Sequence, residues 1–248
     1  MTAPVNVNRA APLKNVAAFT TLLERMVGRD SDLPGLACFF GPSGWGKTKS
    51  AIYGANRYRA AYVECGQFTT ARSLLSNLLI ELGEPKPRGS IEELLTRAIM
   101  FMVADPRRPV IVDEAHFVAG KRFVDLLREL SDKSGAPIIM IGEELLPRHL
   151  ENFERVHNRV LEWLPAVPCD AEDFALLVKS RLKKLTIAPD LAAAILQKTE
   201  GNTRRIVTNL ARAEEIAQLH GWDKIDLAGF GGADAIRARA SMTPRVYR

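Results

Sequence analysis

The chain has 248 residues, 47% of them hydrophobic and 25% charged, which is ordinary for a globular protein with one large domain and a small appendage. No apolar run reaches the length of a membrane span, Met1-Thr2-Ala3-Pro4 does not resemble the start of a signal peptide, and the three scattered cysteines lack metal-site spacing. We therefore expect no membrane span and no metal site at the cysteines, which should be buried free thiols in a reducing cytoplasm. The net charge is +5, but four arginines and one aspartate in residues 231–248 supply +3 of it, so net charge alone does not predict nucleic-acid binding.

The first part of the chain, residues 1–33, is predicted to be an N-terminal arm followed by one helix. Residues 1–13 contain prolines and asparagines and read as an extended arm. Asn15 is a good capping residue for a helix that continues to about Val27, because apolar residues recur at helical spacing.

A complete phosphate-binding motif, GxxxxGK[ST], occupies residues 41–48. An apolar run over 36–40 predicts a buried strand before it, and residues 49–60 predict a helix after it. Glycines let backbone N–H groups curl around an anion, and the helix start adds a positive dipole end. Lys47 is expected to reach the β- and γ-phosphates of ATP, and the Thr48 hydroxyl to ligate Mg²⁺.

A second nucleotide motif follows about 65 residues later. A short strand over 60–65 and helices over 69–82 and 90–103 lie between the two motifs. The apolar run that begins at Val110 then ends in Asp113 and Glu114. We expect Asp113 to hold the Mg²⁺ shell and Glu114 to activate the attacking water. The residues expected to hold the nucleotide are Gly41, Pro42, Ser43, Gly44, Trp45, Gly46, Lys47, Thr48, Lys49 and Asp113.

Strands continue to alternate with helices up to Pro165, which predicts an α/β domain over 34–167 with a parallel sheet covered on both faces. The later elements of this domain are a helix over 121–134, a strand over 137–142, a helix over 145–154 and a strand over 159–164. Three helices alone are predicted for a C-terminal lid over 168–230, at about 171–184, 189–199 and 204–220. Residues 231–248 are predicted to be a basic flexible tail.

This order of motifs resembles the AAA+ ATPases over roughly residues 12–228. Within that superfamily the chain looks most like the transposition ATPases: phage Mu transposition protein B and its transposon relatives TniB and TnsC. The phrases that carry the resemblance are Gly-Pro-Ser-Gly-x-Gly-Lys-Thr, Val-Asp-Glu-Ala-His and Gly-Asn-Thr-Arg-Arg-Ile-Val-Thr-Asn-Leu. The resemblance implies an ATPase of the bacterial or phage-infected host cytoplasm that forms helical filaments on duplex DNA and stimulates a transposase in DNA recombination.

The resemblance also assigns two arginines. Arg159 matches the arginine finger that acts in trans on a neighbouring subunit's γ-phosphate, with Arg155 as the second choice. The alternative is that these arginines pair with Glu151 and Glu162 on the surface. Arg204 matches the lid sensor that contacts the γ-phosphate in cis, unless it is a helix-start arginine that faces solvent.

Two further residues, Glu143 and His116, are expected near the acidic pair. Glu143 stands at the end of the sensor strand, where a small polar residue is usual, and an ionised carboxylate cannot donate a hydrogen bond to phosphate. We therefore expect Glu143 to point away and hydrolysis to be slow; brisk turnover without DNA would contradict this. His116 is expected to support the site rather than to react.

Local basic residues suggest where duplex DNA would bind. Two predicted helix starts fall at the carboxyl edge of the sheet, where they could converge on one face and contact the DNA backbone without reading its sequence. The residues concerned are Thr69, Thr70, Arg72, Lys121 and Arg122, with Lys86 and Arg88 on the neighbouring loop. The alternative is that they are solvated surface charges. The arginines of the tail could bind DNA, dock a transposase or only add solubility.

Other functions remain open at this stage. A helicase loader or an initiator-like AAA+ ATPase would load a partner rather than mark a site, and a winged helix after the lid would favour it. A signalling or secretion ATPase would have no DNA role. Asp113-Glu114-Ala115-His116 also occurs in DEAH helicases, but the second motor domain of such an enzyme has no counterpart here.

Overall fold

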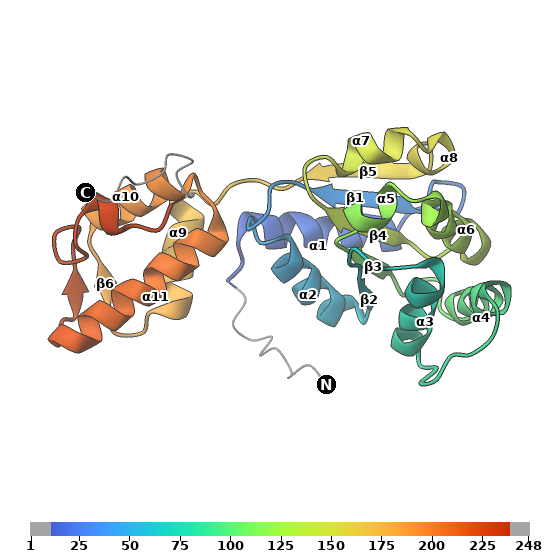
Figure 1. Ribbon diagram of the computed structural model, residues 1–248, viewed down its shortest axis with the longest axis horizontal. Helices are drawn as coiled ribbons and strands as arrows, with labels where there is room; N and C mark the ends of the chain where they lie inside the picture. The colour runs from blue at the N-terminus through green and yellow to red at the C-terminus, as the bar shows by residue number, and fades with distance from the viewer. Residues whose placement is uncertain (1–10, 239–248) are drawn as a thin grey trace. The chain divides into compact units, whose positions relative to one another are not determined.

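The structure, a computed structural model, describes residues 11–238 and divides them into two units (Figure 1). Residues 15–167 form the first unit, and residues 168–238 form the second together with residues 11–14. Within this described range, no helix combines the length and apolar character needed to cross a membrane.

The first unit is built on a five-stranded parallel sheet with the strand order β2-β3-β4-β1-β5. The strands are β1 (Leu36–Phe40), β2 (Ala61–Glu64), β3 (Val110–Asp113), β4 (Ile138–Gly142) and β5 (Val160–Pro165). β1 lies inside the sheet, with Phe39 beside Ile141 on one side and Leu164 on the other. Almost continuous apolar runs form β1, β3 and β4 because a parallel sheet buries both of its faces.

Helices cover both faces of this sheet (Figure 1). On one face, α1 (Lys14–Val27) and α2 (Lys47–Tyr58) share a core with Phe39, and the rings of Phe19 and Phe39 lie 5.3 Å apart. The helices that share the other core are α3 (Ala71–Leu82), α4 (Ile91–Ala104), α6 (Asp125–Ser134), α7 (Leu146–Glu151) and α8 (Glu154–His157). Because Phe19, Leu22 and Met26 are buried in the first of these cores, α1 belongs to the sheet unit and not to a separate arm.

Two helices predicted in this unit have different limits. The helix predicted over 121–134 is divided into α5 (His116–Ala119), a 3₁₀ turn at Arg122–Val124 and α6. Lys121 stays extended because its ammonium bonds the carbonyl oxygens of the β2–α3 loop. The helix predicted over 145–154 ends at Glu151, and α8 is a separate turn after Phe153, whose non-helical backbone interrupts the helix.

The second unit contains α9 (Ala171–Arg181), α10 (Pro189–Thr199) and α11 (Thr203–His220) around its own core. Asp170 caps α9 by accepting hydrogen bonds from the backbone of Glu172 and Asp173. The unit is not made of helices alone, since β6 (Thr186–Ile187) and β7 (Lys224–Ile225) form a two-residue parallel pair. The predicted α/β class, with a helix-flanked parallel sheet and a helical C-terminal part, is confirmed.

The start of the predicted flexible tail is in fact packed against this unit. Phe230 and Ile236 are buried, and Arg212 donates to the carbonyl of Ala235. Asn209 makes hydrogen bonds of 3.0 and 2.9 Å to the backbone of Arg237, and this pairing fixes the segment. The rest of the predicted tail, residues 239–248, lies outside the described residues.

Candidate nucleotide-binding site

The phosphate loop connects the carboxyl end of β1 to α2. Gly44 and Gly46 have φ angles of 84° and 86°, a left-handed conformation that favours glycine. A Cβ atom at Gly46 would meet nothing within 4 Å, so backbone conformation rather than space requires glycine there. A Cβ at Gly41 would instead lie 3.0 Å from the Cβ of Ala166. The loop therefore has the backbone form that a phosphate cradle needs.

Lys47 begins α2 and folds back over the loop. Its ammonium donates to the carbonyl oxygens of Gly41 at 2.6 Å and Pro42 at 2.9 Å, and only 9% of the residue is exposed. Burial lowers the pKa of Lys47, while the negative charges of Glu114 and Asp113 act in the opposite direction. A desolvated cation at the mouth of the loop can exchange these carbonyl partners for phosphate oxygens.

Asp113, at the end of β3, is held from two sides and is 2% exposed. The backbone N–H of Glu114 donates to one carboxylate oxygen at 2.8 Å, and the hydroxyl of Tyr62 donates to the other at 2.7 Å. Thr48 is exposed at the start of α2. Carboxylate and hydroxyl oxygens are the ligands that Mg²⁺ prefers, so the donor set fits this ion.

Glu114 has an unusual backbone. Its φ of 53° is left-handed, which is uncommon for a residue other than glycine and often marks a functional position. Its carboxylate lies 3.3 Å from Nδ1 of His116, so His116 contacts the acidic pair as expected for a supporting residue. Burial, followed by the charge of Asp113, raises the pKa of Glu114 above its usual 4.5. A carboxylate with a raised pKa is a better proton acceptor.

Two residues that the sequence analysis did not assign to the site contact it. Asn15 is not a helix cap, because α1 already begins at Lys14. Its buried amide instead donates to the carbonyl oxygens of Trp45 and Val167, both at 2.8 Å, and thereby fixes the phosphate loop. Tyr62 is the second such residue, and the only sequence signal was a hydroxyl on the strand next to the one that ends in the acidic pair.

We expect replacement of Tyr62 by phenylalanine to raise the Mg²⁺ concentration for half-maximal ATP hydrolysis roughly tenfold. Asp113 would lose the donor that fixes its second oxygen, and such supporting contacts typically affect metal affinity 10- to 100-fold. Mg²⁺ titrations of the hydrolysis rate measure the shift. The matched control is Tyr58→Phe, which removes a hydroxyl that bonds Glu24 instead. Equal Mg²⁺ dependence in the two variants would rule out this role for Tyr62.

Arg159 lies at the other end of the sheet from the phosphate loop. The backbone N–H of Leu36, at the start of β1, donates to the Arg159 carbonyl oxygen, whereas Gly41 follows the end of β1. Five residues of strand separate them, which is roughly 16 Å at 3.3 Å per residue. Arg159 therefore lies away from the phosphate loop of its own chain.

The side chain of Arg159 pairs with Asp132 at 3.3 Å. Arg159 thus has a surface partner, as in the predicted alternative, but Glu162 is not that partner because it pairs with Arg25 of α1. The side chain lines a cavity of about 380 Å³. The cavity is lined by Arg128, Arg155, Asn158 and Arg159.

The other polar and charged residues predicted for the nucleotide site are exposed. Ser43 and Lys49 are exposed on the loop and on the first turn of α2. Glu143 is exposed directly after β4, where its charge and that of Glu144 still favour the charged form of Lys47. Arg204 is exposed on the first turn of α11, in the second unit.

The structure brings together part of the predicted DNA surface. The ammonium of Lys121 donates to the carbonyl oxygens of Gln67 at 2.9 Å and Thr69 at 2.8 Å, which joins the β2–α3 loop to the segment after β3. Thr70 caps α3, so Lys121 and the start of this helix share one edge of the sheet. Phe68, between the two bonded carbonyls, is 90% exposed.

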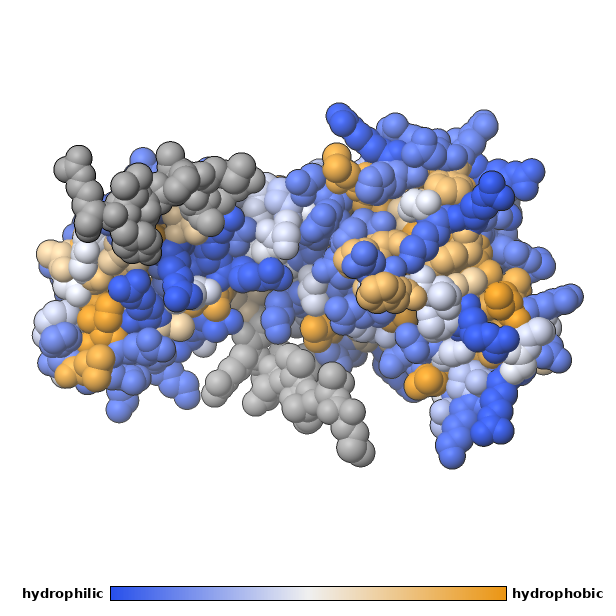
Figure 2. Space-filling model, viewed as in Figure 1, coloured by the Kyte–Doolittle hydropathy of each residue, from blue (hydrophilic) through white to orange (hydrophobic). Residues whose placement is uncertain are grey.

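The other two predicted DNA residues are also exposed on this unit. Arg72 donates to the carbonyl of Gly89 at 2.6 Å, and Arg122 begins the 3₁₀ turn that follows Lys121. The face shown in Figure 2 is mainly hydrophilic over this unit, with several separate apolar areas. A polar surface with a protruding aromatic side chain is compatible with nucleic acid.

Comparison with known proteins gives one family match and a set of similar structures. Residues 30–150 match a family described as an AAA domain. No curated protein matches the chain. Cdc6p of Pyrobaculum aerophilum is similar in structure, with a TM-score of 0.66, 19% identity, and coverage of 90% of this chain and 66% of Cdc6p. The Aeropyrum pernix ORC1 protein, solved in complex with DNA, gives a TM-score of 0.66 and 21% identity over 94% of this chain and 67% of ORC1.

The Holliday junction branch migration motor RuvB of Thermotoga maritima is more distant, with a TM-score of 0.57 and 17% identity over 90% of this chain and 66% of RuvB. The chain thus spans about two thirds of the length of these proteins. At such low identity the likeness establishes only the fold, which this chain shares with these proteins.

Proposed function

We propose, from the AAA+ fold of this chain and its AAA domain over residues 30–150, that it is an ATPase that assembles on duplex DNA and brings a partner protein there. The observation that carries the proposal is the position of Arg159 relative to the phosphate loop. A phosphate loop and an acidic pair lie at one end of the sheet, and Arg159 lies at the other. Such a chain completes its site by contact with a second copy.

In one chain, different residues would bind the phosphates, hold Mg²⁺ and accept the proton of water. Lys47 would leave its loop carbonyls for the β- and γ-phosphates of ATP, while Thr48 and Asp113 hold Mg²⁺. The ion, when bound, would neutralise phosphate charge. Glu114 would accept the proton of the attacking water, which its raised pKa favours. Arg204 is the residue that the resemblance to the AAA+ ATPases assigns to the γ-phosphate.

Arg159 would act on the nucleotide of the neighbouring copy. It is half-exposed beside an open cavity, so its guanidinium can leave Asp132 for a stronger anion. Arg155 lines the same cavity and remains the second choice. In other nucleotide hydrolases an arginine supplied in trans raises the rate about 10³- to 10⁵-fold.

A mixing experiment tests this assignment. The variants Arg159→Ala and Glu114→Gln should each hydrolyse ATP at least about 100-fold more slowly than the unaltered protein. An equimolar mixture should regain a substantial part of the lost rate, because an Arg159→Ala subunit keeps its own Glu114 and receives Arg159 from its neighbour. Lys133→Ala, in a surface pair with Glu129, is the control and should leave the rate unchanged. A mixture as inactive as its two components would contradict action in trans.

For DNA, we propose the surface around the β2–α3 loop. Its backbone contacts would come from hydroxyls, helix starts and basic side chains, none of which reads sequence. The residues of this surface are Thr69, Thr70, Arg72, Lys121 and Arg122, with Phe68 at the tip of the loop.

Replacing Lys121 and Arg122 together by alanine is expected to lower the affinity for duplex DNA about 10- to 100-fold at moderate salt. The slope of log affinity against log salt should flatten by about one to two, because one or two phosphate contacts are lost. Arg107→Ala is the control, since this exposed arginine precedes β3 at the opposite edge of the sheet. Fluorescence anisotropy at several salt concentrations gives both quantities. An unchanged slope would mean that DNA binds elsewhere.

Two finer functions fit this description. An initiator-like or helicase-loading ATPase is supported by the structures of Cdc6p and ORC1, and this support is the stronger of the two. A regulator of DNA transposition that recruits a transposase is supported by the phrase Gly-Asn-Thr-Arg-Arg-Ile-Val-Thr-Asn-Leu over residues 201–210. Electron microscopy with ATP and duplex DNA separates them. Continuous spirals along the DNA would favour transposition, and short closed assemblies would favour loading.

A further inference from the structure

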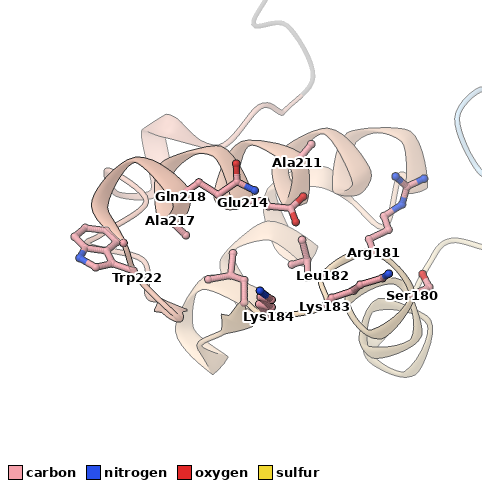
Figure 3. A pocket seen from close by; sticks show the side chains of 12 residues that line it. Ser180, Arg181, Leu182, Lys183, Lys184, Ala211, Glu214, Ala217, Gln218 and Trp222 are labelled. Carbon is pink, nitrogen blue, oxygen red and sulfur yellow. The ribbon is translucent and has the colours of Figure 1, made fainter.

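A groove in the second unit lies between α11 and the segment that follows α9 (Figure 3). It has a volume of about 590 Å³ and runs from Arg181 at one end to Trp222 at the other. Leu182, Leu185 and Ala217 contribute apolar atoms to its lining and are themselves at least 92% buried. A rigid apolar floor of this kind suits an inserted side chain.

The two walls of the groove differ in charge. Arg181, at the end of α9, and Lys183 and Lys184 just after it lie on one side, while Glu214, on α11, is the single acidic residue of the lining (Figure 3). Among residues 11–238, no carboxylate lies within ion-pair distance of any of the three cations. One wall thus presents three uncompensated positive charges beside an apolar floor.

Trp222 gives the groove an aromatic end. Its indole is 43% exposed and stacks on His220, with ring centroids 4.5 Å apart. An exposed aromatic side chain at the end of a groove is a typical anchor for a bound peptide.

We propose that this groove binds an acidic amphipathic segment of a partner protein. The apolar face of the segment would lie on the floor toward Trp222, and its carboxylates would meet the wall of Arg181, Lys183 and Lys184. A phosphate backbone fits less well, since it would run past Glu214 and leave the apolar floor unfilled. The last ten residues of this chain do not match either, because they contain three arginines and no acidic residue. All residues of the groove belong to the second unit, so binding of the segment should require neither ATP nor DNA.

Nuclear magnetic resonance of the full chain can test the groove. The chain has three tryptophans, and the indole N–H signal of Trp222 can be assigned with Trp222→Phe. The probe is a synthetic helical peptide of about four turns, with leucines at helical spacing and glutamates between them. We expect this peptide to shift the Trp222 indole signal and to leave the signals of Trp45 and Trp163 in place.

Two variants of equal charge change make the test specific. Lys184→Glu should weaken binding of the acidic peptide at least about tenfold. Lys198→Glu, at an exposed position on α10 that does not line the groove, should weaken it less than threefold. The same peptide with lysines in place of its glutamates should not bind. Thermal unfolding of each variant checks that the fold is kept.

Three results would overturn the proposal. The acidic peptide could leave the Trp222 signal unmoved. Lys198→Glu could weaken binding as much as Lys184→Glu, which would mean that the net charge of the protein, and not the groove, determines the affinity. A short duplex DNA could shift the Trp222 signal while the acidic peptide does not, which would make the groove a nucleic-acid surface.

Discussion

Replacing Lys47 by alanine is expected to weaken ATP binding about 100-fold or more. The ammonium is buried at the mouth of the phosphate loop, and burial makes its attraction for a phosphate stronger than that of an exposed lysine. Loss of a charge-assisted contact of about 3 kcal/mol corresponds to this change in affinity. Titration with a fluorescent ATP analogue measures it directly.

The fold of the Lys47→Ala variant should be kept. The change removes a desolvated cation and leaves the carbonyl oxygens of Gly41 and Pro42 without a donor, effects that oppose each other. Without nucleotide its melting temperature should stay close to that of the unaltered protein, and only the rise on adding ATP should disappear. Lys133→Ala is the control, because this lysine pairs with Glu129 on the surface and is not among the residues expected to hold the nucleotide. If the two variants bind ATP equally well, Lys47 does not hold the phosphates.

Replacing Glu114 by glutamine should lower the rate of hydrolysis by about 10²- to 10⁴-fold while ATP binding stays within a few-fold. Glutamine has nearly the same shape but cannot take a proton from water, and a positioned base typically contributes this much. Assemblies on DNA should then persist for longer after ATP is added. Single-turnover hydrolysis and ATP titration separate the two effects. Glu144→Gln is the control, because this neighbouring carboxylate also faces Lys47.

The pH dependence of hydrolysis should also show whether Glu114 is the base. Burial and the charge of Asp113 raise the pKa of Glu114 above 4.5, and only the ionised form can act as a base. As the pH falls through this raised pKa, the rate should therefore drop at a higher pH than an exposed glutamate would give. The Glu114→Gln variant should lack this limb. A limb at or below pH 4.5, or one that survives in the variant, would assign it to another group.

Much of the site could be predicted from the sequence because its chemistry is local. Gly44 and Gly46 are required by the backbone of one short loop, and Lys47 follows them at the start of a helix. Asp113 and Glu114 end an apolar strand, which positions them at the carboxyl edge of any parallel sheet. Such features depend on neighbours in the chain, so spacing alone reveals them.

The alternation of strands and helices likewise predicted the class of the fold, but not the order of its strands. β1 lies between β4 and β5, and these pairs join residues that are more than 100 positions apart. Apolar runs such as that of β4 fit any inner position of a parallel sheet equally well, since every inner strand is buried on both faces. Only the packed helices select one order.

Side-chain partners that are distant in the chain were decided by tertiary structure. Asn15 looked like a helix cap but bonds Trp45 and Val167, and Tyr62 meets Asp113 from 51 positions away. These pairings arise only when neighbouring strands and helices bring the residues together.

The sequence by itself thus determined the phosphate loop, the acidic pair and the α/β class, because each rests on short-range backbone geometry and apolar periodicity. The tertiary structure decided that Arg159 pairs with Asp132 and lies at the far end of the sheet from the loop. It also decided that the segment ending at Arg237 is packed against α11, although its composition suggested a flexible tail. The physical reason is the same in both cases: contacts between segments that are distant in the chain outweigh what each segment would do alone.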